Sequence, residues 1–443
     1  MAYGTVRWGS VRTRGGTEKM SVRRGTFRSL VALGGAALLA LVGSGTADAS
    51  IALGVVVGTN PVNYTPNINQ GAVYKMAELN GILYAGGEFS SVSAAPGVGG
   101  GTVNRSNIVA FNAATGVIQS FAPSINGQVW AIVAANNSLY VGGTFSSVNG
   151  VARRGLVKLN PTTGAVDTAF NAGLNNTVRE AAVVNGRLII SGTFSKRIQA
   201  VNLTTGADTG YINVPVTGSV ADNAGPTEVY RFAVDPAGTR LVGIGNFTSV
   251  GGQSRWRAFM LTLGAASATV NAWNYAPLQK PCAASSLMDY MRDVDFSPDG
   301  SWFAMVSTGF VPRTGEIGET LCDATARFET GIANPFRPTW INYTGGDTLH
   351  SVAVTDVAVY VQGHQRWLDN ANGRDFAAPG AVSRPGIGAI SPTTGKALSW
   401  NPTKDRGVGG KDLLVTPRGL WVGSDQDRIG GEFHNKIALL PVP

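Results

Sequence analysis

The stretch Leu79-Asn-Gly-Ile-Leu-Tyr-Ala-Gly-Gly-Glu-Phe89 returns twice in altered form, as Ala135-Asn-Asn-Ser-Leu-Tyr-Val-Gly-Gly-Thr-Phe145 and as Val184-Asn-Gly-Arg-Leu-Ile-Ile-Ser-Gly-Thr-Phe194. Each copy contains the end of one strand, a polar turn, and an alternating apolar strand that ends at Gly-x-Phe. An internal repeat of this kind indicates an array of similar structural units. Looser copies, which bring the number to seven, end at Phe247, Phe310, Gly363 and Gly423.

A second sequence marker, a Thr-Gly turn, follows the strand that ends at Gly-x-Phe. The turn Ala114-Thr-Gly116 recurs as Thr163-Gly164, Thr205-Gly206 and Thr394-Gly395. It leads into a strand that carries one aromatic residue, and we expect this residue to belong to the core. The seven aromatic residues are Tyr64, Phe121, Phe170, Tyr211, Trp273, Trp340 and Trp400.

The order of these parts predicts the topology. A full repeat has four strands, at Val129–Ala135, Leu139–Phe145, Leu156–Leu159 and Ala165–Asn171. The last repeat ends after its third strand, whereas an unmatched fourth strand lies around Tyr64. A split repeat of this kind predicts a closed ring in which the N-terminal strand completes the last sheet. We therefore predict an all-β fold, a seven-bladed β-propeller over residues 50–443 as a single domain.

The segments Gly142–Gly150 and Thr163–Phe170 carry a family resemblance. They read Gly-Gly-x-Phe-x-x-Val-Asn-Gly and Thr-Gly-x-x-Asp-x-x-Phe, and they resemble the delta-60 type β-propeller repeat of secreted bacterial proteins. The resemblance covers essentially the whole predicted domain and is strongest in the first three repeats. It implies a fold and an extracellular setting but no chemistry, because propellers host many functions.

The composition agrees with a strand-rich globular chain. Hydrophobic residues make up 44% of the sequence and charged residues only 14%, and 59 of the 443 residues are glycine. The hydrophobic fraction excludes a disordered chain, and the glycine content suits short strands joined by tight turns.

Residues 1–49 have the features of a secretory signal peptide. Arg23, Arg24 and Arg28 precede the apolar run Leu30–Val42, and Ala47-Asp48-Ala49 matches a cleavage site. Met20 would open a leader of ordinary size, so residues 1–19 are a candidate misassigned start. We expect a secreted, soluble product without membrane insertion.

The net charge of +8 comes mostly from this leader. Of the 35 Lys and Arg residues seven lie in it, and of the 27 Asp and Glu residues two do, so the rest of the chain is nearly neutral. Such a balance gives no support for a nucleic-acid partner.

Cys282 and Cys322 are the two cysteines of the chain. In an exported protein a pair of cysteines favours a disulfide; two buried thiols are the alternative.

Loop length separates the two faces of the predicted ring. The turns between first and second strands and between third and fourth strands are short, which is typical of purely structural connections. The remaining connections are long and irregular, and binding residues usually lie on such loops. They span 91–106, 217–228, 277–289, 311–327, 365–385 and 425–435.

The start of each first strand should line the mouth of a central channel. The residues there are aromatic, basic and acidic, whereas a packed core would have Val or Ile. Aromatic faces beside hydrogen-bonding charges suit a sugar; the alternative is a solvated, salt-bridged mouth. The candidate ligand-binding residues are Tyr74, Trp130, Arg179, Tyr230, Arg231, Arg292, Asp293, His350 and Lys411.

Other motifs carry less information. Arg105, Arg153, Arg255 and Arg384 recur just before each third strand, with His434 at the matching place, and we interpret them as structural bridges between blades. Asp369–Asp375 is a weak calcium motif, and we expect no metal site and no cofactor. No H-E-x-x-H occurs, and no G-x-S-x-G lies after the leader, so we predict no enzyme activity.

These observations favour a secreted recognition module that binds a cell-surface or extracellular glycan in a lectin-like way. One alternative is a protein-interaction subunit of a larger secreted assembly. A second is a propeller enzyme such as a lyase, glycosidase or quinoprotein.

Overall fold

The computed structural model describes residues 51–220, 225–284 and 286–443, and the expected leader lies outside them. These residues belong to one compact unit, Ser44–Pro443. Regular structure in the described ranges is β throughout, apart from a 3₁₀ turn at Ala276–Gln279. No helix there has the length and apolar character needed to cross a membrane. The all-β prediction is therefore confirmed.

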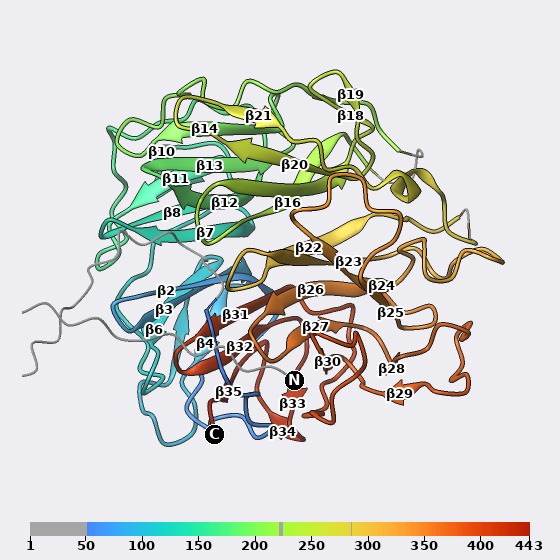
Figure 1. Ribbon diagram of the computed structural model, residues 1–443. Coiled ribbons are helices and arrows are strands. Elements are labelled where there is room, and N and C mark those ends of the chain that lie inside the picture. The colour runs from blue at the N-terminus through green and yellow to red at the C-terminus, as the bar shows by residue number, and fades with distance from the viewer. Residues whose placement is uncertain (1–50, 221–224, 285) are drawn as a thin grey trace, which may run out of the picture. The chain divides into compact units, whose positions relative to one another are not determined.

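Seven main antiparallel sheets, each of three or four strands, follow one another along the described chain, besides smaller sheets formed by the connections. Figure 1 labels their strands. In each sheet the first strand pairs with the second and the second with the third. The sheets are β2 (Ala72–Leu79), β3 (Ile82–Glu88) and β6 (Ile108–Asn112); β7 (Val129–Ala135), β8 (Ser138–Gly143) and β11 (Leu156–Leu159); β12 (Val178–Val184), β13 (Arg187–Gly192) and β14 (Ile198–Asn202); β16 (Glu228–Val234), β17 (Arg240–Asn246), β20 (Ala258–Leu263) and β21 (Ala268–Val270); β22 (Met291–Phe296), β23 (Trp302–Ser307), β24 (Ala324–Glu329) and β25 (Trp340–Tyr343); β26 (Leu349–Val354), β27 (Val359–Gly363) and β30 (Ile387–Ile390); β31 (Asp412–Thr416), β32 (Gly419–Gly423) and β35 (Ile437–Pro441).

The first strands of successive sheets pack against one another. Contacts run from β2 to β7 and onward in chain order to β31, and β31 in turn contacts β2. The two ends of the series of sheets are therefore neighbours.

The segment before β2 lies along β35. The backbone N–H of Gly58 donates to the carbonyl of Pro441 (2.7 Å), and the N–H of Val62 donates to the carbonyl of Leu439 (3.0 Å). The N–H of Ile68 donates to Asn435 in the same way (3.0 Å). The aromatic residue of this segment, Tyr64, packs on the core that contains Ile437 and Leu439. The segment that sequence reasoning assigned to the last sheet is thus hydrogen-bonded to that sheet.

Turn chemistry explains where the hairpins fold. Asn80 and Gly81 have φ values of 51° and 76°, and Asn185 and Gly186 have 47° and 76°. Two consecutive residues with positive φ make a type I′ turn, which matches the twist of a hairpin and favours Asn-Gly. In the turn that follows the third strand, a side chain accepts the backbone hydrogen bonds. The Oδ1 of Asn112 accepts the N–H groups of Ala114 (2.9 Å) and Thr115 (3.0 Å).

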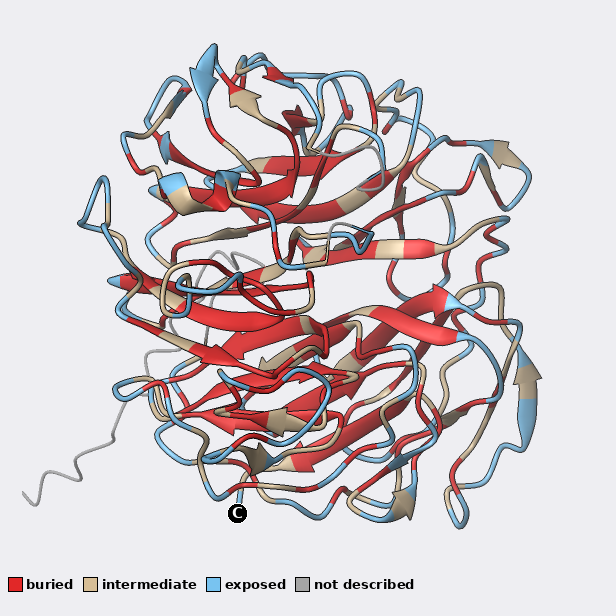
Figure 2. Cartoon of the chain, turned by 90° about the vertical axis from the view of Figure 1, so that its right-hand side faces the viewer, coloured by how far each residue is buried: buried red, intermediate tan, exposed pale blue. Residues whose placement is uncertain are grey.

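Six of the seven aromatic residues that mark the predicted fourth strands lie in the core, although in the described ranges only β21 and β25 are fourth strands. Phe121, Phe170, Tyr211, Trp273, Trp340 and Trp400 are all buried, whereas Tyr64 is partly exposed. Phe121, Phe170 and Trp400 each contact an aromatic residue of the second strand; the Tyr140 and Phe170 ring centres, for example, lie 5.5 Å apart. Buried residues accordingly follow the long strands, and exposed residues follow the connections (Figure 2).

Several long connections contain small hairpins of their own. They pair locally, and two of them also pair with a short strand that precedes the same sheet. These elements are β4 (Ser91–Ser93) and β5 (Thr102–Asn104) with β1 (Asn67–Ile68); β9 (Ser147–Val148) with β10 (Val151–Ala152); β18 (Ser249–Val250) and β19 (Gln253–Ser254) with β15 (Val216–Thr217); β28 (Trp367–Leu368) with β29 (Val382–Ser383); and β33 (Arg428–Ile429) with β34 (Glu432–Phe433).

The recurrent arginines do not bridge different sheets, which corrects the prediction. The Nη2 of Arg153 donates to the carbonyl of Thr168 (2.9 Å), and the Nη2 of Arg105 donates to that of Gln119 (2.8 Å). Both acceptors lie in the fourth-strand segment of the same repeat. Each arginine thus ties a loop hairpin to the outer edge of its own sheet, because its fork of donors can satisfy carbonyls that the ladder leaves free.

Candidate functional site

Six of the predicted ligand-binding residues occupy one equivalent backbone position. In six first strands the pairing register skips a single residue, which makes a β-bulge. A bulge redirects the side chain of the extra residue and twists the strand locally. The skipped residues are Tyr74, Trp130, Arg179, Tyr230, Arg292 and His350, and Lys411 directly precedes β31. We call these seven residues, with Tyr290, the rim cluster.

One half of the rim cluster is a continuous series of ring contacts. The rings of Tyr74 and Trp130 are stacked, with centres 4.4 Å apart. The guanidinium of Arg179 lies 4.6 Å from the centre of the Trp130 ring and 5.7 Å from that of Tyr230. Tyr230 meets the ring of Tyr290 edge-on at 6.3 Å. Cation–π and aromatic contacts therefore link neighbouring first strands.

Polar groups fix this half in place. The Tyr74 hydroxyl donates to Glu88 (3.0 Å), and Gln128 donates to the same carboxylate (2.7 Å). The indole N–H of Trp130 donates to Gln128 (3.0 Å). Burial, followed by the Glu88 carboxylate, raises the pKa of Tyr74, so its hydroxyl stays protonated. Since Tyr74 and Arg179 come from the strands on either side of β7, the Trp130 ring is held between them.

The other half of the rim cluster is cationic. The guanidinium of Arg292 lies over the ring of Tyr290, 4.3 Å from its centre. The ring of His350 contacts that of His364, with centres 6.1 Å apart. Burial lowers the pKa of His350 well below its ordinary value, and the nearby Arg292 and Lys411 charges lower it further. His350 is therefore a neutral imidazole at neutral pH.

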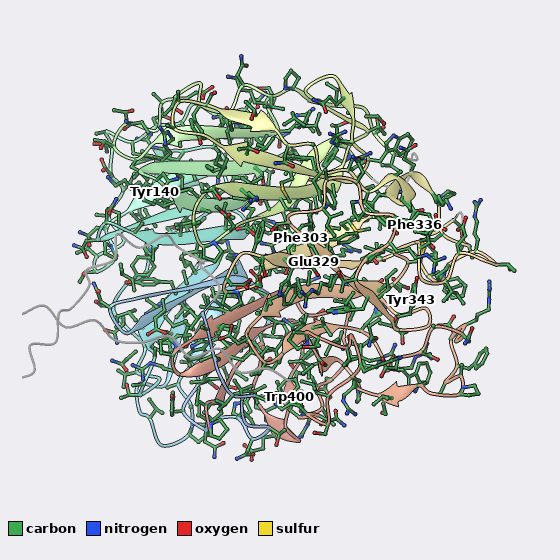
Figure 3. The ribbon with its side chains drawn as sticks, viewed as in Figure 1. Tyr140, Phe303, Glu329, Phe336, Tyr343 and Trp400 are labelled. Atoms are coloured by element: carbon green, nitrogen blue, oxygen red, sulfur yellow. A yellow bond between two sulfur atoms is a disulfide. The ribbon has the colours of Figure 1, made fainter. Side chains whose placement is uncertain are left out.

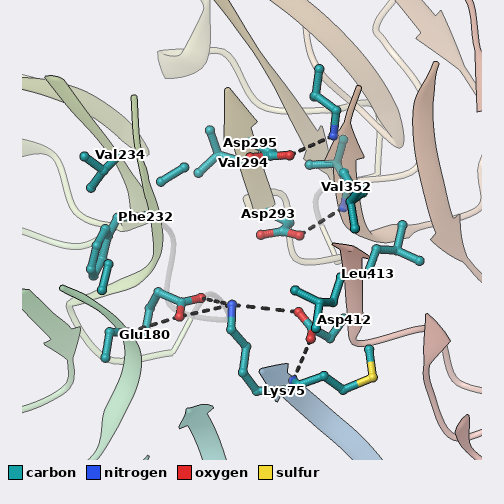
Figure 4. A pocket seen from close by; sticks show the side chains of 18 of the residues that line it. Lys75, Glu180, Phe232, Val234, Asp293, Val294, Asp295, Val352, Asp412 and Leu413 are labelled. Carbon is teal, nitrogen blue, oxygen red and sulfur yellow. Dashed lines mark hydrogen bonds and ion pairs between the residues drawn. The ribbon is translucent and has the colours of Figure 1, made fainter. Parts of the chain in front are cut away.

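A layer of buried and partly buried charges follows the rim cluster by one residue along the strands. The Nη1 of Arg231 lies 2.6 Å from the Oε2 of Glu180. The Nζ of Lys75 lies 3.3 Å from Glu180 Oε1 and 3.8 Å from Asp412 Oδ1, as Figure 4 shows. The Oδ2 of Asp293 accepts the backbone N–H of Val352 (3.0 Å). Arg231 is thus held inside the fold, whereas the other predicted basic residues stand at the rim.

Burial and neighbouring charge set the protonation of this layer. Burial raises the pKa of Asp293 to about 6 and that of Asp412 to about 6, against the opposing effect of Arg231 and Lys75. Burial alone would also raise the pKa of Glu180, but Lys75 and Arg231 lower it overall. The three carboxylates therefore differ in pKa: that of Glu180 is lowered, whereas those of Asp293 and Asp412 are raised. Glu180 is the anion that both cations share.

A cavity of about 110 Å³ begins at this charged layer. Six first strands line it, and beyond the charged layer its walls are mostly apolar, with Phe232, Val294 and Leu413 among them, although Asp235 and Asp295 also line it (Figure 4). A second, more open cavity of about 540 Å³ lies beside Glu88. Sequence reasoning missed the second cavity, since its walls come from loops of different repeats. It is lined by the polar residues Gln70, Glu88, Ser90, Asn104, Arg105, Ser106, Asn107 and Asn126, with Gly71, Phe89 and Ile125.

Cys282 and Cys322 form a disulfide, as predicted, with 5.8 Å between their Cα atoms. It joins the segment before β22 to the connection between β23 and β24.

The acidic residues of the described ranges, including those of the weak calcium motif, do not come together in a metal site. In the described ranges no group of three or more His, Cys, Asp or Glu side chains is placed to hold a metal ion. In the weak calcium motif the Oδ1 of Asp369 accepts from Asn342 (2.6 Å), and Asp375 pairs with Arg366 (2.7 Å).

Comparison with known proteins links one repeat to a described family. Residues 134–170 match a domain of unknown function, the DUF5122 β-propeller. This segment starts near the end of β7, contains β8 and β11, and ends at Phe170.

No curated protein matches the chain. Among solved structures, the computationally designed Ika8 protein is 10% identical, with a TM-score of 0.45 over 87% of this chain and 100% of that one. The WD40 β-propeller domain of Doa1 is 8% identical, with a TM-score of 0.48 over 86% of this chain and 95% of the domain.

Proposed function

We propose that the seven sheets are the blades of a closed seven-bladed β-propeller. Two observations support the proposal: β31 contacts β2, and residues 58–62 extend the last sheet through hydrogen bonds to β35. We further propose that the chain is a secreted protein of the delta-60 repeat type, which the DUF5122 match in residues 134–170 and the disulfide support.

On this scaffold the protein is proposed to be a non-enzymatic recognition module that binds a glycan at the rim cluster. The observation that carries the proposal is the aromatic and cationic series from Tyr74 to Arg292, which places a stacking or hydrogen-bonding side chain near the start of five successive first strands. Next to it, the cavity of about 540 Å³ offers amides and hydroxyls that match sugar hydroxyls. Since the Trp130 ring is already held on its neighbours, the rim is preorganised, which lowers the cost of binding.

The test is a glycan array followed by calorimetry on the purified protein. Trp130→Ala should weaken binding at least about tenfold, which corresponds to about 1.4 kcal/mol. Phe336→Ala is the matched control, because the Phe336 side chain (labelled in Figure 3) is 86% exposed and lies in the connection between β24 and β25. Absence of binding to every glycan, or equal affinity of the two variants, would refute the proposal.

A protein partner is the second candidate. Five exposed apolar side chains lie in the long connections, and exposed apolar groups in one region often mark a protein interface. They are Leu287, Met288, Ile317, Phe376 and Phe433. If this candidate is correct, Phe376→Ser and Phe433→Ser should lose a protein that co-purifies from the culture medium, while Trp130→Ala retains it.

A further inference from the structure

The charges of the rim cluster are distributed unevenly. Arg179 has a carboxylate partner, since its Nε lies 3.2 Å from Glu228 Oε2. Arg292 and Lys411 have no carboxylate oxygen within 4.0 Å among the described residues. Two cations, on the sheets on either side of the one that carries His350, thus have no counter-ion from the described chain.

Both unpaired cations are partly withdrawn from solvent. The Nε of Arg292 is buried and has no hydrogen-bond partner among the described residues. Its guanidinium lies on Tyr290, a neutral phenol that leaves the positive charge uncompensated. Burial lowers the pKa of Lys411, and Arg292 and Arg231 lower it further, against the opposing effect of Asp425. Partly buried charges of one sign are costly unless an opposite charge joins them.

The nearby anions are already engaged. The carboxylate of Asp425 accepts the backbone N–H groups of Val408 (3.0 Å) and Gly409 (3.3 Å). The carboxylate of Asp347 pairs with Arg366 (2.9 Å) and Arg406 (3.0 Å). Neither acid therefore forms an ion pair with Arg292 or Lys411.

Glycines complete the wall of this region. Gly409 has a φ of 142°, and a Cβ at this position would overlap the ring of His350. A Cβ at Gly410 would overlap the side chain of Gln362. The backbone just before Lys411 therefore lies directly on the neighbouring sheet, and this contact positions the lysine beside His350.

We propose that Arg292 and Lys411 form a seat for the anionic group of an acidic saccharide, with neutral His350 between them. The inference rests on the proposed glycan-binding function and adds the chemical class of the ligand, a carboxylate-bearing sugar such as a uronic acid. A guanidinium can hold a carboxylate through two parallel hydrogen bonds, and an ammonium adds a point charge. The sugar ring would then face the aromatic half of the rim cluster.

The test compares two oligosaccharides with one ring skeleton, an oligogalacturonate and its fully methyl-esterified form. Calorimetry with the purified protein should show the acid bound at least about tenfold more tightly, and added salt should reduce the difference. Arg292→Gln and Lys411→Gln should each remove the preference. Lys396→Gln should keep it, because the Lys396 side chain is 73% exposed and lies in a turn between third and fourth strands.

The outcomes separate the two proposals. Equal affinity for acid and ester, with binding that still depends on Trp130, would overturn the anion seat and leave the glycan site intact. If neither sugar binds, the anion seat is tested with sulfate instead, by measuring the Tm of each variant with and without sulfate. A sulfate-induced rise in Tm that Arg292→Gln and Lys411→Gln both lose would support the seat without the sugar. An equal rise in all variants, or no rise, would overturn it.

Discussion

The Arg231 guanidinium and the Glu180 carboxylate form a buried ion pair between two neighbouring first strands, with 2.6 Å between Nη1 and Oε2. The Nζ of Lys75, on the first strand β2, also lies close to this carboxylate. These strands belong to three separate sheets, so the pair and its neighbour hold distant parts of the chain together.

Removal of the shared anion should destabilise the protein. Glu180→Gln leaves Arg231 and Lys75 buried without their main partner, and breaking a buried ion pair costs about 3–5 kcal/mol. Urea unfolding should show this loss, whereas the double variant Glu180→Gln/Arg231→Met should recover part of it. If Glu180→Gln unfolds at the wild-type midpoint, the ion pair does not hold the strands together.

Stability should depend on the protonation of Asp412. Its pKa in the folded protein is about 6, above the value of about 3.9 for an unfolded chain. The folded state therefore binds this proton more tightly, and the free energy of unfolding should fall as pH rises from about 4 to about 6. The effect of this one group is roughly 3 kcal/mol at most.

The matched variant is Asp412→Asn, which keeps an oxygen that can accept the N–H of Met76. Urea unfolding at several pH values should give a flatter profile for this variant between pH of about 4 and about 6. Parallel profiles for variant and wild type would show that Asp412 titrates outside this window.

The N-terminal segment should contribute to stability through its backbone. Val62→Pro removes the N–H that donates to Leu439, and a buried carbonyl left without its donor costs about 1–3 kcal/mol. Val62→Ala keeps the N–H and serves as the control for lost packing. Equal unfolding midpoints for the two variants would contradict a role for this hydrogen bond.

The disulfide should stabilise the loops that it joins. Cys282 and Cys322 are separated by 40 positions, and a cross-link over a loop of this length contributes about 2–4 kcal/mol. The Cys282→Ser/Cys322→Ser variant should therefore show a lower Tm than wild type, and a reducing agent should lower the Tm of wild type alone. A reductant effect on the double variant would point to another cause.

The sequence by itself determined the local structure and the repeat. Asn80-Gly81 and Asn185-Gly186 allow the two positive φ values that a tight hairpin needs, and the buried aromatic residue of each full repeat marks its fourth strand. These features depend on a residue and its immediate neighbours, so each repeat can be interpreted alone. The same periodicity identified Tyr74, Trp130 and Arg292 as equivalent positions.

Only the tertiary structure decided how equivalent positions differ in role. Arg179 pairs with Glu228 while Arg292 has no counter-ion among the described residues, although both are bulge residues of first strands. The recurrent arginines bond to their own repeat, and Trp130 is held between neighbours. The physical reason is that charge pairing and burial depend on side chains from other strands, whose distances are fixed only when the sheets pack together.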